Sequence, residues 1–352
     1  MTHPEITVSR EEQQRVLAQM IRDDEVLTKA RRKGACFLFD AQISPALAAP
    51  SAIDSRASKS SGCGSKSSWD FNDNNHHMHH TTVAGNKRKY LVHLPDDYDA
   101  DSSSPVVLSF HGVAGNSFGQ EGDSQLSYHR QRLADKGIIA VYPQGLDGKG
   151  GGASWDGAPY AESDADDIDF VHTILDELSD NLCVDTSRIY ASGFSNGGGF
   201  THLLACTPSI NKRVAAFGMA SGAYYPASHP GSKCDPGRKV PVLLTHGDGD
   251  PTVHFQGENP KTKTNLHNLP FISDFAKDWA ERNGHERDSY DCSRLNGDDD
   301  VHLWTWGNDG DAGQVRRYRV LGMTHMWPSR PHNAPFNLSE EVLLPFFGQY
   351  TL

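Results

Sequence analysis

The sequence of 352 residues is short of basic residues, of long apolar runs and of internal repeats. Lys and Arg number 33 against 45 Asp and Glu, and the net charge of −12 argues against nucleic-acid binding, which needs a basic face. No run of about 18 apolar residues occurs, so no transmembrane helix is predicted. The glycine-rich stretch 148–152 lacks the Lys-Ser/Thr of a phosphate-binding loop. The single N-glycosylation sequon, at Asn337, carries little weight.

Cysteine is also scarce, with six residues. Cys183 precedes a predicted strand, and Cys206 ends the predicted helix that follows it. A helix that runs back along the strand would bring these ends together, so a Cys183–Cys206 bridge is expected. The alternative is that the cysteines are free buried thiols. Pairing cannot be deduced for the remaining four, Cys36, Cys63, Cys234 and Cys292.

A G-x-S-x-G motif occupies residues 193–197, with Ser195 at its centre. It joins an apolar strand pattern at 188–192 to a helix-like run at 198–204. Such a serine stands on a tight strand-to-helix turn, which needs glycine on both sides because the backbone packs closely there. Alone the motif is weak, since a chain with this much glycine gives about 0.3 matches by chance.

Three further segments are expected to supply the other catalytic groups that accompany such a serine. A β-rich run ends in His111 and Gly112, the place of a second oxyanion amide. A later apolar run leads into a loop that carries Asp248 and Asp250, and His325 follows the last strand pattern. Serine, then acid, then histidine is the chain order of the α/β-hydrolases, and it differs from that of chymotrypsin and of subtilisin.

Residues 188–199, with Cys183 before them and Cys206 after them, resemble the secreted esterases of carbohydrate esterase family one. The most similar members are the fungal feruloyl esterases, with the polyhydroxybutyrate-depolymerase-like enzymes as neighbours. The resemblance covers about residues 60 to 352. The segments at 61–64, 142–145, 166–170 and 325–328 fit the same family.

The resemblance implies a catalytic triad of Ser195 as nucleophile, His325 as base and Asp250 as the acid that orients the imidazole. Asp248, two residues earlier on the same loop, is the rival of Asp250. Asp250 is preferred because the family pattern H-G-x-x-D-x-x-V matches residues 246–253.

The oxyanion hole is expected to combine the backbone amide of Asn196 with that of Gly112 or Val113. His111 is interpreted as a residue that braces this loop rather than as a second catalytic base. Substrate contact is a further prediction for residues that stand beside the triad or in loops after strands, although packing alone explains each equally well. These residues are His111, Trp155, Tyr224, Tyr225 and Trp327.

No metal or other cofactor is expected. The histidine-rich run 76–80 lies in a polar stretch without a spaced cysteine or carboxylate partner, so we interpret it as a solvated approach to a strand. The acidic runs 298–300 and 309–311 do not complete an EF-hand loop and are interpreted as turns.

From residue 79 onward, short hydrophobic runs alternate with helical patterns. This alternation predicts an α/β-hydrolase fold, with a mostly parallel central sheet flanked by helices on both faces. Helices are predicted at 166–182, at 269–281 and from about 339. The predicted strands are 89–94, 106–110, 138–142, 188–192, 215–220, 240–245, 301–306 and 315–321.

Residues 1–60 are predicted to form a leader and linker, and residues 61–352 the esterase domain. A basic cluster at 31–33, an apolar run at 35–39 and a cleavage-like site near Ala49 resemble a signal peptide displaced by about 30 residues. This suggests a misassigned start. A short amphipathic helix followed by a disordered linker is an equally good interpretation of this segment. Residues 51–75 are predicted to form a mobile linker.

The prediction is therefore a secreted, metal-independent serine esterase. By resemblance, its substrates are feruloyl or other hydroxycinnamoyl esters on plant cell-wall arabinoxylan, and this polysaccharide is the expected partner. The first alternative is the same chemistry on acetylxylan or on a short polyester such as polyhydroxybutyrate. The intact triad disfavours an inactive polysaccharide-binding protein, and the chain leaves no room for the gating domain of a related peptidase. The oligomeric state is left open.

Overall fold

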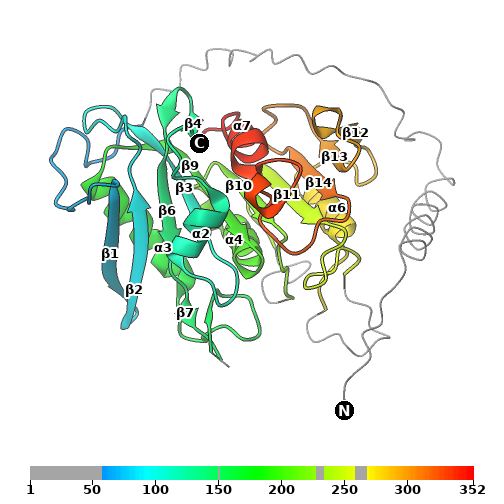
Figure 1. Cartoon of the computed structure of the whole chain (residues 1–352), viewed down its shortest axis with the longest axis horizontal. Coiled ribbons are helices and arrows are strands. Elements are labelled where there is room, and N and C mark those ends of the chain that lie inside the picture. The colour runs from blue at the N-terminus through cyan, green and yellow to red at the C-terminus, as the bar shows by residue number, and fades with distance from the viewer. Residues whose placement is uncertain (1–57, 150, 227–233, 258–267) are drawn as a thin grey trace. The chain divides into compact units, whose positions relative to one another are not determined.

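The computed structural model of the chain describes residues 58–149, 151–226, 234–257 and 268–352 (Figure 1). The predicted leader, the signal-like segment and the first part of the linker lie outside the described residues. Within these ranges, no helix has the length and apolar character needed to cross a membrane.

A ten-stranded sheet lies at the centre of the described chain (Figure 1). Its strand order is β1-β2-β6-β3-β9-β10-β11-β14-β13-β12. The strands from β6 to β14 run parallel, whereas β1 and β2 at one side and β13 and β12 at the other pair antiparallel. The strands are β1 (His76–Val83), β2 (Asn86–His93), β3 (Ser104–Phe110), β6 (Ile139–Pro143), β9 (Val184–Phe194), β10 (Ala216–Ala220), β11 (Val242–Gly247), β12 (Asp291–Arg294), β13 (Val301–Trp306) and β14 (Val315–Val320).

Every residue of β3, β6, β10 and β11 is buried. Strands covered on both faces read as continuous apolar runs, which is why these four were predicted, and the other predicted strands are found as well. The predicted α/β-hydrolase fold is confirmed. Two edge strands were not predicted. β1 is rich in histidine and half-buried, so the predicted approach to a strand is itself a strand, and β12 is largely exposed.

Helices cover both faces of the sheet (Figure 1). One face carries α3 (Asp167–Asn181), α4 (Asn196–Cys206) and α6 (Ile272–Arg282), whose apolar residues share one core cluster. The other carries α2 (Ser117–Ser124), the π-helical turn η4 (Leu338–Leu343) and α7 (Leu344–Phe347). Shorter elements are β4 (Arg132–Leu133), β5 (Lys136–Gly137), β7 (Leu146–Asp147), β8 (Ala153–Ser154), α5 (Pro208–Asn211), η2 (Leu295–Gly297) and η3 (Arg330–His332).

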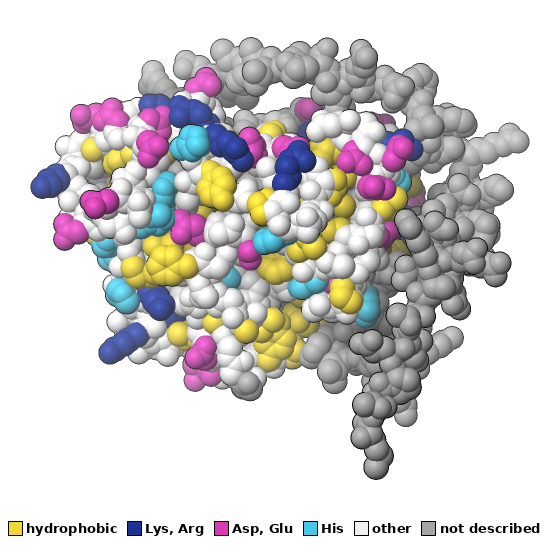
Figure 2. All heavy atoms as spheres, in the orientation of Figure 1, with side chains coloured by type: hydrophobic (Ala, Val, Ile, Leu, Met, Phe, Trp, Pro, Cys, Tyr) yellow, Lys and Arg dark blue, Asp and Glu magenta, His cyan; other side chains and the backbone are white. Residues whose placement is uncertain are grey.

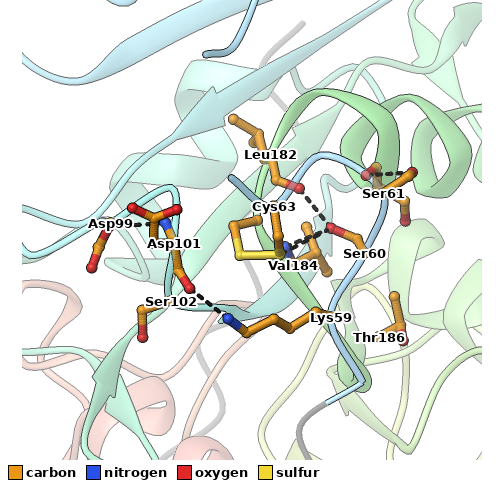
Figure 3. Close-up of a disulfide and its surroundings, with 12 residues drawn as sticks. Lys59, Ser60, Ser61, Cys63, Asp99, Asp101, Ser102, Leu182, Val184 and Thr186 are labelled. Atoms are coloured by element: carbon orange, nitrogen blue, oxygen red, sulfur yellow. Dashed lines mark hydrogen bonds between the residues drawn. A yellow bond between two sulfur atoms is a disulfide. The ribbon is translucent and has the colours of Figure 1, made fainter. Parts of the chain in front are cut away.

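The segment from residue 58 to 75, predicted to be mobile linker, is held against the domain instead (Figure 3). The Ser60 hydroxyl donates a 2.7 Å hydrogen bond to the carbonyl of Leu182, at the end of α3. Cys63 is bonded to Cys183, and Trp69 is buried in the core. The polar composition predicted a solvated chain because its few anchoring residues are spread among serines and glycines.

The predicted Cys183–Cys206 bridge is wrong. Cys183 pairs with Cys63, and Cys206 pairs with Cys234. The reason lies in the lengths of the two elements. The eleven residues of β9 extend about 36 Å at about 3.3 Å per residue, whereas the eleven of α4 extend only about 16 Å. The helix therefore ends far short of the start of the strand, where Cys183 lies.

Candidate active site

Ser195 stands at the turn between β9 and α4, with φ 53° and ψ −119°, a conformation that non-glycine residues rarely adopt. A Cβ added to Gly193 would lie 2.2 Å from the carbonyl oxygen of Gly197. One added to Gly197 would lie 2.3 Å from the carbonyl oxygen of Phe110. These approaches exclude a side chain at either position, so the motif needs both glycines to place the serine at the carboxyl edge of the parallel sheet.

Side chains from three loops meet at that edge. The Nε2 atom of His325 lies 2.8 Å from the Ser195 hydroxyl oxygen, and its Nδ1 atom lies 2.7 Å from Oδ2 of Asp250. A neutral imidazole placed in this way donates its Nδ1 proton to Asp250 and accepts a hydrogen bond from Ser195 at Nε2. The structure thus brings together the three residues that the sequence suggested as a triad.

Asp250 is buried and held by several donors. Its Oδ1 atom accepts hydrogen bonds of 2.8 Å from the amides of Thr252 and Val253. Burial alone raises the pKa of the Asp250 carboxyl, but hydrogen bonds from His246 and His325 and the attraction of these rings outweigh it and hold the pKa well below its usual range. The carboxylate is therefore ionised at neutral pH and orients His325.

Asp248, the rival acid, is engaged elsewhere. Its Oδ2 atom pairs with the guanidinium of Arg319 at 2.9 and 3.0 Å. Its Oδ1 atom accepts a 2.6 Å hydrogen bond from the amide of Gly322. These bonds tie the loop after β11 to the end of β14, from which the His325 loop begins. The geometry favours Asp250 as the partner of His325.

The expected oxyanion amides lie beside the serine. A Cβ on Gly112 would stand 3.2 Å from Cβ of Ser195, so the loop that carries Gly112 and Val113 borders the hydroxyl. The amide of Asn196 is the first of helix α4, where a helix offers no acceptor of its own. The side chain of Asn196 turns away and accepts a 2.9 Å hydrogen bond from the amide of Trp155.

His111 braces this loop. Its Nδ1 donates to the carbonyl of Gly112 at 2.7 Å, and its Nε2 accepts from the amide of Gly145 at 3.0 Å. Burial lowers the pKa of His111 to about 4, so the ring is neutral at neutral pH. Because the residue is only 1% exposed, it has no free face for a substrate. The geometry supports the bracing interpretation over substrate contact.

Three of the four aromatic candidates for substrate contact are sealed in the core. Trp155, Tyr224 and Trp327 are 0%, 1% and 2% exposed, respectively. Tyr224, for example, stacks on Phe275 with a centroid distance of 3.7 Å. A ligand cannot reach these rings, so they pack in the core rather than contact substrate as predicted. Residue type and loop position do not distinguish a ring that lines a site from one that supports it. Substrate contact stays a prediction for Tyr225.

Two features of the site were missed. The ring of Phe194, the variable residue before the serine in the motif, packs on the His325 ring at a centroid distance of 4.9 Å. A small apolar cluster also borders the relay, since Val253 belongs to it and donates its amide to Asp250. Phe194 and Val253 lie within the two sequence patterns at 193–197 and 246–253, but neither pattern assigns these residues a role at the site. The cluster comprises Ala223, Tyr225, Val253 and Leu269, with Ala158 and Tyr160 packed against it.

One group of three side chains capable of binding a metal occurs in the described part of the chain, formed by His202, Cys206 and Cys234. The two sulfur atoms are joined to each other in a disulfide. Oxidised sulfur is not the thiolate that metals bind, so the group offers only one ligand in this state.

Comparisons with known proteins agree with this fold. The sequence pattern of the prolyl oligopeptidase family matches residues 124–217. The acetyl xylan esterase of Aspergillus awamori shares the fold with a TM-score of 0.55 at 16% identity, covering 77% of this chain and 99% of that one. A probable feruloyl esterase C of Aspergillus clavatus is 30% identical over 223 residues, or 62% of this chain and 71% of that protein.

A bifunctional acetylxylan esterase/xylanase, XynS20E of Neocallimastix patriciarum, is 31% identical over 264 residues, which are 74% of this chain and 33% of that protein. Matches to other curated feruloyl esterases span 36% and 58% of those relatives' lengths.

The fold, with a serine on a strand-to-helix turn and a histidine within reach of it, defines an α/β-hydrolase. Within that class, the chain belongs to the fungal feruloyl esterase-like family. The relatives that it matches include feruloyl esterases and a bifunctional acetylxylan esterase/xylanase.

Proposed function

We propose that Ser195 is the nucleophile of this esterase, with His325 as its general base and Asp250 as the orienting acid. The observation that carries the proposal is the continuous relay of 2.7 and 2.8 Å hydrogen bonds that ends on the Ser195 hydroxyl. A serine hydroxyl is a weak nucleophile until a base takes its proton, and His325 is placed to do so.

The reaction then has two halves. As Ser195 Oγ attacks the ester carbonyl, His325 takes its proton and Asp250 stabilises the imidazolium. The alcohol leaves with that proton, and water activated by His325 hydrolyses the acyl-enzyme. The amides of Asn196 and of Gly112 or Val113 hold the negative oxygen. Loss of one such donor typically costs about 10²–10³ in turnover.

The substrates are hydroxycinnamoyl esters, chiefly feruloyl esters on the arabinoxylan of plant cell walls. The names of the feruloyl esterase relatives support this choice. So does the apolar cluster beside the relay, where Tyr160 and Tyr225 pack edge to face. An aromatic acyl group fits apolar and aromatic surroundings better than an acetyl group does. The Cys63–Cys183 and Cys206–Cys234 disulfides support an extracellular location, because such bonds persist in oxidising compartments.

The second candidate is an acetylxylan esterase. It is favoured by the match to the bifunctional acetylxylan esterase/xylanase, which covers 74% of this chain, more than the 62% covered by the feruloyl esterase C of Aspergillus clavatus. The relay serves both reactions equally, so only the acyl pocket separates the two candidates.

The deciding experiment compares kcat/KM for methyl ferulate with kcat/KM for acetylated xylan, using the full chain. The proposal expects ferulate to be preferred by at least about tenfold, the discrimination that a few buried apolar contacts provide. A preference for the acetyl ester would move the substrate to acetylxylan and leave the relay unchanged.

A further inference from the structure

A hollow of about 450 Å³ opens beside β2, away from the relay. Its walls include His80 of β1, Lys87 and Lys89 of β2, Asn116 at the start of α2, and Gln144 and Asp147 after β6. A volume of this size suits one or two sugar-sized groups. None of these residues belongs to the relay.

The hollow lies at the same edge of the sheet as the nucleophile. β2 runs antiparallel to β6, so the start of β2 lies at the carboxyl end of β6, and Tyr90 pairs with Pro143 there. Since β6 and β3 separate β2 from β9, the lateral distance to Ser195 is three strand spacings, about 14 Å. Gln144 links the two places, because its Nε2 lies 3.3 Å from Nε2 of His111, the residue that braces the Gly112 loop.

Two lysines give the hollow a positive wall. Lys87 and Lys89 point to one face of β2, and Arg88 between them points to the other, where it is buried 2.6 Å from Asp167. Both lysines are exposed and have no acidic partner among the described residues. Figure 2 shows Lys and Arg side chains at the lower left, over the β1–β2 hairpin of Figure 1. In a chain of net charge −12, two neighbouring unpaired cations favour an anionic ligand.

We propose that the hollow binds a carboxylate-bearing sugar of the polysaccharide whose ester is cleaved at Ser195, that is, a uronic acid substituent. This inference rests on the proposed function, and it adds a second point of attachment to the same glycan. The Lys87 and Lys89 ammonium groups hold the carboxylate, and the side chains of Asn116 and Gln144 line the same hollow, where their amide groups can meet sugar hydroxyls. Asp147, the acidic residue among those lining the hollow, repels an anion and so weakens the binding of the carboxylate.

The test measures binding without turnover, on the full chain carrying Ser195→Ala. Titration calorimetry compares a xylo-oligosaccharide that bears glucuronic acid with the neutral oligosaccharide of equal length. The proposal expects the acidic sugar to bind more tightly. Adding Lys87→Gln and Lys89→Gln should raise its Kd about fivefold or more and leave the neutral sugar unaffected, because each exposed ion pair contributes modestly. Asp147→Asn should lower the Kd.

A matched control removes the same charge elsewhere. Lys66 and Lys212 are exposed and lie near the opposite edge of the sheet, so Lys66→Gln with Lys212→Gln should leave the Kd unchanged. In the chain with native Ser195, the Lys87 and Lys89 double variant should hydrolyse methyl ferulate at the normal rate, since that ester is too small to reach the hollow.

Three results would overturn the inference. They are equal Kd values for acidic and neutral sugars, no change on losing both lysines, and inorganic phosphate binding as tightly as the acidic sugar, which would mark a general anion site. Because binding is measured directly, these failures remain separate from a failure of the proposed function, which would show instead as the native chain lacking ester hydrolysis.

Discussion

Asp250 and Asp248 stand two residues apart on one loop, yet their surroundings give them different tasks. Asp250 touches His325, whereas Asp248 holds Arg319 and the amide of Gly322. Asp250→Asn should therefore reduce kcat on an ester by about 10⁴, because an amide no longer holds the correct tautomer of His325.

The matched variant Asp248→Asn should keep kcat within about tenfold of the native value and lower the thermal midpoint instead, since it weakens one ion pair that ties two loops together. Steady-state kinetics and thermal unfolding on both proteins check the pair of expectations. If the larger loss of kcat followed Asp248→Asn, the two acids would have to exchange roles.

His111 makes the stability of the fold depend on pH. Burial holds its pKa at about 4, below the ordinary value of about 6.5. Between these values the unfolded chain binds more protons than the folded one, so stability is lost as the pH falls from about 6.5 towards 4. His111→Gln removes this proton linkage and should flatten the decline of the thermal midpoint across that window. Parallel curves for the two proteins would show that His111 does not carry the effect.

At the scale of elements, the junction of β9 and α4 tolerates no side chain at Gly193. A Cβ there would lie 2.2 Å from the backbone of Gly197, and neither element can shift without moving Ser195. Gly193→Ala should therefore abolish cooperative unfolding or lower the midpoint by many degrees, as judged by calorimetry.

Gly122 in α2 provides the control for that variant. A Cβ added there meets nothing within 4 Å, and alanine favours a helix over glycine by up to about 1 kcal/mol. Gly122→Ala should leave the midpoint unchanged or raise it. An equal loss in both variants would mean that glycine at the turn has no special role.

The Cys63–Cys183 and Cys206–Cys234 disulfides close loops of different size, with sequence separations of 120 and 28 residues. In the chain-entropy account the longer loop contributes about 5 kcal/mol and the shorter about 3.5 kcal/mol. Replacing Cys63 and Cys183 by alanine should thus lower the free energy of unfolding by about 1 kcal/mol more than replacing Cys206 and Cys234. Urea unfolding of the two double variants measures the difference, and the reverse order would contradict the entropic account.

The same elements show what sequence patterns can predict. Strands buried on both faces were located because continuous apolar runs leave few alternatives, and α3 was located because Val171, Ile174 and Leu178 recur at helical spacing. β1 was missed as a strand because its histidines carry no alternating pattern. The disulfide pairing was mispredicted because spacing along the chain does not give the lengths of the elements that separate two cysteines.

At the scale of the whole molecule, the site joins residues that lie 75 and 130 positions apart, Asp250 and Ser195 from His325. Motif order was sufficient to nominate them, because parallel strands place their following loops at one edge. Motifs could not tell which aromatic rings are sealed, as Trp155 is, since burial depends on contacts among distant segments. Tyr225 was predicted, but the cluster that it forms with Ala223, Val253 and Leu269 was missed for the same reason.

The central claim is that Ser195 attacks the ester, and one measurement tests it most directly. The native chain and Ser195→Ala are each treated with a fluorophosphonate, and ester hydrolysis and intact mass are followed together. The account predicts one phosphonate adduct per native chain, located on Ser195 by peptide mapping, with complete loss of hydrolysis. Ser195→Ala should take up no adduct, hydrolyse no ester and keep its thermal midpoint. Full hydrolysis by Ser195→Ala, or an adduct on another residue, would contradict the account.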